Sequence, residues 1–228
     1  MPLIHSISGI RGTLGGSFSE GLNPVNTAQF VAAFGTWINR NPMAIRSKKE
    51  KKKVVIGRDA RTSGLMFSQV VSGVLMGLGI DVIDIGPAPT PTVELTVIGE
   101  NADGGIILTA SHNPKEWNAL KLLNRQGEFL SDEAGREVLR IATTRSFDFA
   151  PYNSIGTRKQ NTTAVQRHIE KILSLPLVDV KTIRSKKFKV VIDCVNSVGG
   201  IAIPPLLEAL GVADIVKINC VADGLFTH

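Results

Sequence analysis

The chain has 228 residues, of which 43% are hydrophobic and 20% are charged, so it is long and apolar enough to bury a core. Its 22 glycines and its low aromatic content of 5% are typical of an α/β protein with many tight turns. No apolar segment is long enough to span a membrane, and the N-terminus lacks the basic and apolar regions of a signal peptide. We therefore expect a cytoplasmic protein without a membrane partner.

The net charge of +6 comes from one short segment, in which seven basic residues stand against a single acid, Glu50. The basic residues are Arg40, Arg46, Lys48, Lys49, Lys51, Lys52 and Lys53. Nucleic-acid-binding surfaces spread such residues along a face and often interleave aromatic side chains, which this run does not. We expect a solvated loop and no nucleic-acid partner. The alternative is a noncatalytic module that binds phosphate, another anion or nucleic acid through residues 46–53.

Helices and short apolar strands alternate from Asn23 onward, where an N-cap residue followed by proline is typical of a helix start. In chain order we expect a helix from 24 to about 38 and strands at 54–57 and 80–85. Between these two strands we expect a helix that Ser63 caps and Gly79 ends. A short helix from 90, strands at 105–109 and 120–123, and a helix from 131 to about 141 should follow. This alternation predicts a mostly parallel sheet with helices on its faces.

Residues 147–156 are rich in turn-forming residues and lack periodicity, so we place a domain boundary there, with domains at 1–150 and 151–228. The second domain is expected to contain a helix near 163–173, a strand at 188–193, a helix at 201–210 and a strand at 214–218. Complete doubly wound domains usually have more strands. The predicted fold is therefore a three-layer α/β/α domain with a mostly parallel mixed sheet, followed by an incomplete second α/β/α domain. We interpret Cys194 and Cys220 as small buried apolar residues.

The segment TASHNP, residues 109–114, follows a predicted strand at the point where open α/β sheets bind their ligands. Ser111, next to His112, could be a nucleophile, but serine, asparagine and proline also form turns, and the segment could equally be structural. A serine hydrolase is a further alternative. Adjacent residues on a turn rarely place an imidazole on the neighbouring hydroxyl, and the sequence contains no GxSxG motif.

Two other segments carry arginine. In SGIRG, Arg11 lies between two glycines, a pattern that suits either an anion site or a flexible N-terminal turn. In GRDARTS, Arg58 and Arg61 lie between a strand and a helix, where they could bind phosphate, or Asp59 could pair with one of them in a structural loop. Together, the three segments at one edge of one sheet predict an anionic, phosphorylated ligand.

The hexapeptide TASHNP, with Asn118 and Lys121 in TASHNPKEWNALK, resembles the active-site serine loop of the α-D-phosphohexomutase superfamily. SGIRG and GRDARTSG resemble the N-terminal arginine loop and the GRDxRxS loop of that family, in the same order. DCVNSVGG, residues 193–200, resembles its second-domain turn, and ADGLF, residues 222–226, resembles the stretch before its metal loop. The resemblance therefore spans nearly the whole chain.

The resemblance implies an enzyme of carbohydrate metabolism that moves phosphate between the 1- and 6-hydroxyls of a hexose or hexosamine phosphate, its small-molecule partner. Phosphorylated Ser111 would donate its phosphate to a sugar monophosphate and would receive the other phosphate of the resulting bisphosphate. Lys121 would be the general acid/base, and Arg11 and His112 would help to hold the phosphoserine. The phosphate- and substrate-binding residues would be Arg58, Arg61, Ser63, Asn113 and Asn118.

The family has four α/β domains around one cleft and uses Mg²⁺, held by the phosphate on the serine, here Ser111, and by aspartates of a DGDxDR loop. That loop is not in this sequence, nor are the specificity loop of the third domain and the phosphate loop of the fourth. The resemblance thus implies a truncated chain that holds Mg²⁺ poorly and does not turn over substrate alone. Asn118-Ala119 replaces the common Asn-Gly, and WNALK resembles the phosphoglucosamine/phosphomannomutase branch more than the glucose-specific one. No oligomeric state is predicted.

Overall fold

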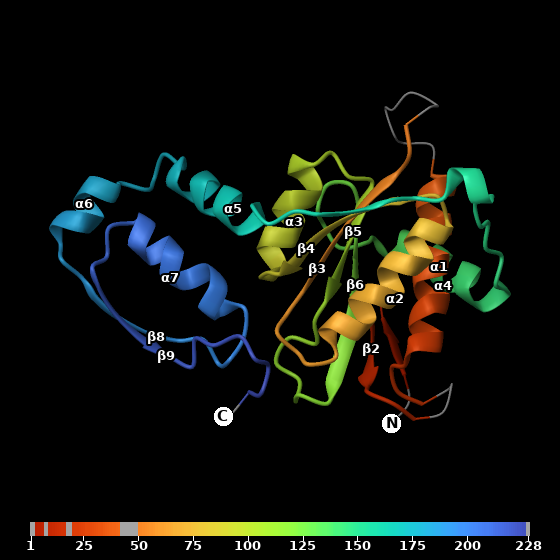
Figure 1. Ribbon diagram of the computed structural model, residues 1–228, viewed down its shortest axis with the longest axis horizontal. Coiled ribbons are helices and arrows are strands. Elements are labelled where there is room, and N and C mark those ends of the chain that lie inside the picture. Colours follow the sequence, from red (N-terminus) through yellow and green to blue (C-terminus); the bar gives the residue numbers. More distant parts are fainter. Residues whose placement is uncertain (1–2, 7–8, 17–19, 42–49, 227–228) are drawn as a thin grey trace.

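The computed structural model describes residues 3–6, 9–16, 20–41 and 50–226, and its first unit is built around a seven-stranded sheet (Figure 1). The strands are β1 (Ile4–Ser6), β2 (Gly9–Thr13), β3 (Lys53–Arg58), β4 (Asp81–Pro87), β5 (Gly104–Leu108), β6 (Trp117–Leu123) and β7 (Arg158–Gln160). Their order is β1-β2-β6-β5-β3-β4-β7. Strands β5, β3, β4 and β7 run parallel, whereas β1, β2 and β6 join the sheet through antiparallel pairings. The expected mixed α/β sheet is confirmed, but among the described strands three of its six pairings are antiparallel, so the sheet is not mostly parallel as predicted.

Helices cover both faces of this sheet and complete three layers (Figure 1). The helices are α1 (Pro24–Arg40), α2 (Gly64–Gly77) and α4 (Asp132–Thr144) on one face and α3 (Thr90–Gly99) on the other. The larger buried cluster includes Phe34 and Phe67 and lies under α1, α2 and α4, while the smaller one includes Val93 of α3. The sheet therefore separates two apolar cores, as its buried strands require.

Two of the predicted helix starts form as expected. The Asn23 side chain accepts hydrogen bonds from the N–H groups of Val25 and Asn26, both at 3.0 Å, and the Ser131 hydroxyl accepts one from Ala134 at 3.2 Å. Ser63 also precedes a helix, but its side chain makes no capping hydrogen bond. The Ser63 hydroxyl oxygen instead accepts a hydrogen bond from Asn118 of β6.

The second unit contains α5 (Ala164–Leu173), α6 (Val180–Ser185) and α7 (Gly199–Ala209), with β8 (Lys189–Asp193) and β9 (Asp214–Ile218) as a parallel pair. The sequence predicted all of these elements except α6. Across the described ranges, no helix has both the length and the apolar character needed to cross a membrane.

Three short strands were not predicted from the sequence. β1 and β2 have three and five residues and contain glycine and polar side chains, and β7 has three exposed polar residues. Pairing with distant strands, rather than local pattern, makes these segments extended. Because β7 pairs with β4, the sheet of the first unit continues past residue 150. The domain boundary at residue 150 stays a prediction.

Helix α5 of the second unit packs against α3 of the first. The His168 Nδ1 atom lies 2.8 Å from the Thr92 hydroxyl, and Arg167 forms an ion pair with Glu100 at 2.9 Å. His168 is half-buried, whereas Arg167 is exposed. The hydrogen bond of His168 is therefore the more sheltered of the two polar contacts.

The pH dependence of stability should reflect this histidine. Burial, reinforced by the positive charge of Lys171, lowers the pKa of His168 from its ordinary value of 6.5. The unfolded chain then binds a proton more readily, so this contribution to stability is present above pH 6.5 and is lost as pH falls through the lowered pKa. Between about pH 7 and about pH 5, urea unfolding should show a smaller loss of stability for His168→Gln than for the wild type. Exposed His112→Gln is the control, and equal losses in all three proteins would contradict the prediction.

Candidate active site

The predicted nucleophile lies in the loop between β5 and β6, residues 109–116, called the serine loop below. Ser111 is exposed and has a φ of 55°, in the left-handed region that residues other than glycine rarely adopt. Its N–H donates to Thr109 Oγ1 at 3.2 Å, and the Thr109 hydroxyl donates to Asp59 Oδ2 at 2.7 Å. Strained positions of this kind persist only where surrounding contacts fix them.

Arg61 supplies most of those contacts, and its side chain is only 1% exposed. Its Nε donates to Asp59 Oδ2 at 3.0 Å. Its terminal nitrogens donate to the carbonyl oxygens of Pro114 (2.6 Å), Trp117 (2.9 Å), Ser111 (3.0 Å) and Asn113 (2.7 Å). All five N–H donors of the guanidinium are thus used inside the protein. In this arrangement Arg61 holds the backbone of the serine loop and has no N–H group left for phosphate, so its role in phosphate binding stays a prediction that this geometry does not support.

Asn118 and Ser63 are also turned into the protein. Asn118 has no exposed surface, and its Nδ2 donates to the Ser63 hydroxyl oxygen at 2.9 Å, while its Oδ1 accepts from the Ala119 N–H at 2.8 Å. Neither residue lines a cavity at the serine loop. Their mutual hydrogen bond joins β6 to the start of α2, which is a structural role, and their role in substrate binding stays a prediction.

Arg58 and Asn113 have more freedom than those two residues. Arg58 is half-buried and donates one hydrogen bond, at 3.2 Å, to the carbonyl oxygen of Asp59, but it lines neither cavity at the serine loop. The Asn113 side chain donates to the Ala110 carbonyl oxygen at 2.7 Å and also borders both cavities. Their roles in phosphate binding stay predictions.

Arg11 and Lys121 reach the serine loop from neighbouring antiparallel strands. Arg11 of β2 pairs with Ala119 of β6, two residues from Lys121, so the two cationic side chains leave the same face of the sheet as diagonal neighbours. At Gly9, where φ is 128°, a Cβ atom would lie 2.2 Å from the carbonyl oxygen of Leu120. Glycine is therefore required for β2 to approach β6 this closely.

A cavity of about 200 Å³, called the phosphate cavity below, lies where these strands meet the serine loop. It is lined by Gly9, Arg11, Ala119 and Lys121 from the strands and by residues 109–113 of the loop. All four residues predicted to be catalytic, Ser111, Lys121, His112 and Arg11, thus border one space. Two cations beside an exposed hydroxyl suit an anion that is attached to, or transferred from, that hydroxyl.

The His112 ring does not activate Ser111 in the manner of a hydrolase. Its Nδ1 atom lies 3.5 Å from the Ser111 hydroxyl oxygen, longer than the distance of about 2.6–3.2 Å expected between a nucleophile and its base. Within the described ranges, no carboxylate hydrogen-bonds to this ring. Both residues are exposed, so His112 is free to contact a group bound to Ser111.

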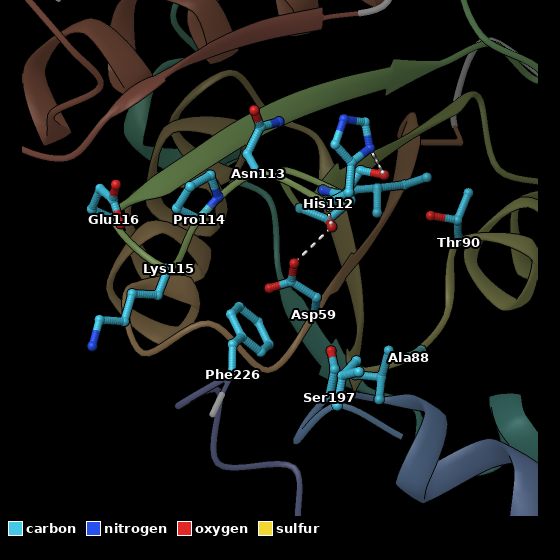
Figure 2. A pocket seen from close by; sticks show the side chains of 15 residues that line it. Asp59, Ala88, Thr90, His112, Asn113, Pro114, Lys115, Glu116, Ser197 and Phe226 are labelled. Carbon is cyan, nitrogen blue, oxygen red and sulfur yellow. Dashed lines mark hydrogen bonds between the residues drawn. The ribbon is translucent and has the colours of Figure 1, made fainter. Parts of the chain in front are cut away.

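A larger cavity of about 680 Å³, the interdomain cavity, opens on the other side of the serine loop. Figure 2 shows Asp59 near its centre, with His112 and Asn113 on one side and Ser197 and Phe226 of the second unit on the other. The Phe226 ring lies 5.0 Å from the guanidinium carbon of Arg61, a cation–π contact. The second unit thus touches the residue that holds the serine loop.

Glu94 of α3 is a charged neighbour of Lys121 that the sequence analysis missed. Burial raises the pKa of Glu94, and the positive charge of Lys121 offsets part of that rise. The Lys121 ammonium also lies 5.7 Å from the centre of the Phe129 ring. In the sequence, Glu94 is distinguished only as the single acidic residue of an apolar helix, and this pattern does not identify Lys121 as its neighbour.

The described side chains include no group of three or more His, Cys, Asp or Glu residues placed to hold a metal ion. The residues present therefore do not fit a complete Mg²⁺ site, and Mg²⁺ stays a prediction that rests on the family resemblance. By the family resemblance, Ser111 would contribute to such a site through a phosphate bound to its hydroxyl.

The described C-terminal part of the basic segment, residues 51–53, lies at the opposite end of the sheet, because Lys53 begins β3 whereas Arg58 ends it near the serine loop. Lys51 and Lys53 donate to the carbonyl oxygens of Ile155 and Glu100, at 2.6 and 2.8 Å, and Lys52 pairs with Asp103 at 3.4 Å. Residues 46–49 of the proposed binding run lie outside the described residues. The described lysines contact the protein itself, so the anion- or nucleic-acid-binding alternative is not favoured.

The fold and the cavity at the serine loop define an α/β/α protein with an exposed hydroxyl and two cationic side chains beside it. Two family profiles match this chain: "Phosphoglucomutase/phosphomannomutase, alpha/beta/alpha domain I" over residues 4–149, and domain II of the same family over residues 166–228. The chain belongs to the phosphoglucomutase/phosphomannomutase family.

Relatives agree with this assignment. A phosphoglucomutase/phosphomannomutase of Thermococcus kodakarensis is 37% identical over 218 residues, or 94% of this chain and 45% of that protein. A phosphoglucosamine/phosphogalactosamine mutase of Sulfurisphaera tokodaii is 32% identical over 228 residues, or 100% of this chain and 46% of that protein. The crystal structure of a family member from Burkholderia thailandensis has a TM-score of 0.77 at 24% identity, covering 99% of this chain and 46% of that one, and shows the same fold. The chain spans less than half the length of these relatives.

Arg61→Lys should destabilise the folded protein by about 3 kcal/mol, because a lysine ammonium cannot serve four carbonyl groups at once and leaves buried acceptors unsatisfied. Arg58→Lys is the matched control in the same loop, since Arg58 is half-buried and donates one hydrogen bond, to the carbonyl oxygen of Asp59, among the described residues. For Arg58→Lys we expect the free energy of unfolding to fall by less than about 1 kcal/mol. Urea unfolding measures both values, and equal losses would show that Arg61 has no special structural role.

Ser111→Gly should be more stable than Ser111→Ala by about 1 kcal/mol, because the left-handed conformation is costly for any residue with a Cβ atom. The same pair of substitutions at His112, whose φ is not positive, should give the opposite order. Thermal unfolding of the four variants tests this. Greater stability of the alanine variant at position 111 would contradict the strained backbone.

Proposed function

We propose that this chain carries a phosphoryl group on Ser111 for a phosphohexomutase reaction of carbohydrate metabolism, in the cytoplasm. The observation that supports this function best is the phosphate cavity, where one exposed hydroxyl faces two strand-borne cations and a histidine. The partner is a small-molecule sugar phosphate, with no role for nucleic acid. Family membership, and relatives that are themselves named as mutases, support the same choice.

In the first half of the reaction, the bond between phosphorus and the Ser111 oxygen breaks and a bond to a hydroxyl oxygen of the sugar monophosphate forms. The proton of that hydroxyl passes through Lys121 to the Ser111 oxygen. The bisphosphate then turns round, its other phosphoryl group returns to Ser111, and the proton returns through Lys121 to the sugar. Arg11 stabilises negative charge on the phosphoryl group during transfer, and His112 contacts the phosphoserine.

Mg²⁺ would neutralise further charge in the family reaction. The phosphate on Ser111 is the one ligand for it that the residues described would offer, which is too few to hold this cation. We therefore propose that these 228 residues alone do not sustain turnover. For the sugar, we favour glucosamine or mannose phosphate over glucose phosphate, because the segment WNALK resembles that branch of the family and one relative is named for glucosamine.

The test is phosphoryl transfer from glucose 1,6-bisphosphate to the protein, followed by intact-mass spectrometry and peptide mapping. Over hours, even a slow transfer accumulates, so we expect the wild type to gain one phosphoryl group on Ser111. Ser111→Ala should gain none. Ser197→Ala is the matched control, since this hydroxyl lines the interdomain cavity but not the phosphate cavity, and it should behave as the wild type does.

Arg11→Ala should slow the transfer by about tenfold to a hundredfold, because one charge-assisted contact to the phosphoryl group is lost. Absence of the adduct from the wild type, or its appearance at another residue, would overturn the proposal. In the same samples, conversion of glucosamine 6-phosphate to the 1-phosphate should not exceed that of Ser111→Ala. Conversion above that background would contradict the inference that these residues alone do not sustain turnover.

A further inference from the structure

The two cysteines of the chain are brought together by the second unit. Cys194 directly follows β8 and Cys220 lies two residues beyond β9, and these strands are parallel neighbours. Their sulfur atoms are 3.4 Å apart. Both are free thiols, separated by 26 positions in the sequence, so a bond between them would close a loop across the ends of the two strands.

Backbone hydrogen bonds fix this juxtaposition. The Cys194 N–H donates to the Ile218 carbonyl oxygen at 3.1 Å, and the Asn196 N–H donates to the Asn219 carbonyl oxygen at 2.8 Å, so strand-like pairing continues on both sides of the cysteine pair. The sulfur atoms would have to approach by about 1.4 Å to reach disulfide length.

The two thiols differ in access. Cys194 is only 6% exposed, and burial, with the neighbouring Cys220 thiol and Asp193 carboxylate, raises the pKa of Cys194 to about 11. Cys220 is half-buried and therefore the more accessible to a reagent in solution. This asymmetry sets an order in which the two sulfurs react.

We propose that Cys194 and Cys220 are a dithiol modification site that a small-molecule disulfide converts into an intrachain disulfide. The Cys220 thiolate attacks one sulfur of the reagent, whose S–S bond breaks and releases one small thiol. The Cys194 thiolate then attacks the Cys220 sulfur, displaces the second small thiol and forms the intrachain bond. The two cysteines are oxidised, the reagent is reduced to two thiols, and the two cysteine protons end on those thiols.

The bond would act on the interdomain cavity through the turn that follows Cys194. Val195, with a φ of 45°, and Asn196, with a φ of 56°, hold left-handed conformations, and Val195 lines that cavity together with Ser111 and His112. A β-branched residue in this region is strained. Joining Cys194 to Cys220 would add a covalent link to the hydrogen bonds that already hold this turn to the end of β9.

The experiment treats the wild-type chain with excess oxidised glutathione, then counts free thiols in denaturant and measures the intact mass. We expect both thiols to disappear, no glutathione adduct to remain, and peptides containing Cys194 and Cys220 to be linked until a reducing agent is added. Folding should raise the ratio of intrachain disulfide to glutathione adduct by about tenfold or more over the same chain in urea, because the folded sheet raises the effective concentration of the two thiols.

Single variants test the order of reaction. Cys194→Ser should retain one glutathione on Cys220, whereas Cys220→Ser should leave the buried Cys194 thiol unreacted. A wild-type protein that keeps its thiols, stops at glutathione adducts or links two chains would overturn the proposal. The reaction needs neither Ser111 nor a sugar phosphate, so its outcome is independent of the phosphoryl-transfer test.

Discussion

The buried guanidinium of Arg61 is the constraint on which the site depends. A cation removed from water is unfavourable by several kcal/mol unless it is paired and its N–H groups are satisfied. Asp59 provides the opposite charge, and four backbone carbonyl groups of the 111–117 region satisfy the remaining donors. Because this arrangement loses its stability if any part of the loop moves away, the same contacts that allow Arg61 to be buried also fix the loop.

That rigidity explains how Ser111 keeps an unfavourable backbone conformation while its hydroxyl remains exposed. The backbone of the serine loop is held by several hydrogen bonds, so the exposed side chains of Ser111 and His112 are left available for chemistry. The cations at the phosphate cavity come from a different source, Arg11 and Lys121 on the paired strands β2 and β6. Buried Arg61 thus has a structural role, whereas Arg11, which is exposed and lies on strand β2, is available to bind an anion.

Sequence reasoning located the site but could not separate these roles. TASHNP at the end of an apolar strand indicated where Ser111 lies, and the helix starts at Asn23 and Ser131 carried their own local signals. In GRDARTS, by contrast, both arginines have the same local context. Arg61 is distinguished by acceptors that are 50 to 56 residues away along the chain. The hydrogen bond from Asn118 to Ser63 spans a similar separation, so neither assignment could be made from local pattern.

The second unit also contacts the segment that contains Arg61. Gly224 is buried with a φ of 73°, and a Cβ atom there would lie 2.0 Å from the carbonyl oxygen of Ala60, so the chain passes directly against the residue before Arg61. Phe226 then covers the Arg61 guanidinium. Since Arg61 binds the backbone of the serine loop, the position of Ser111 and the placement of the second unit are set by one shared group. A ligand that fills the interdomain cavity therefore meets the serine loop and Phe226, both of which contact Arg61 before the ligand binds.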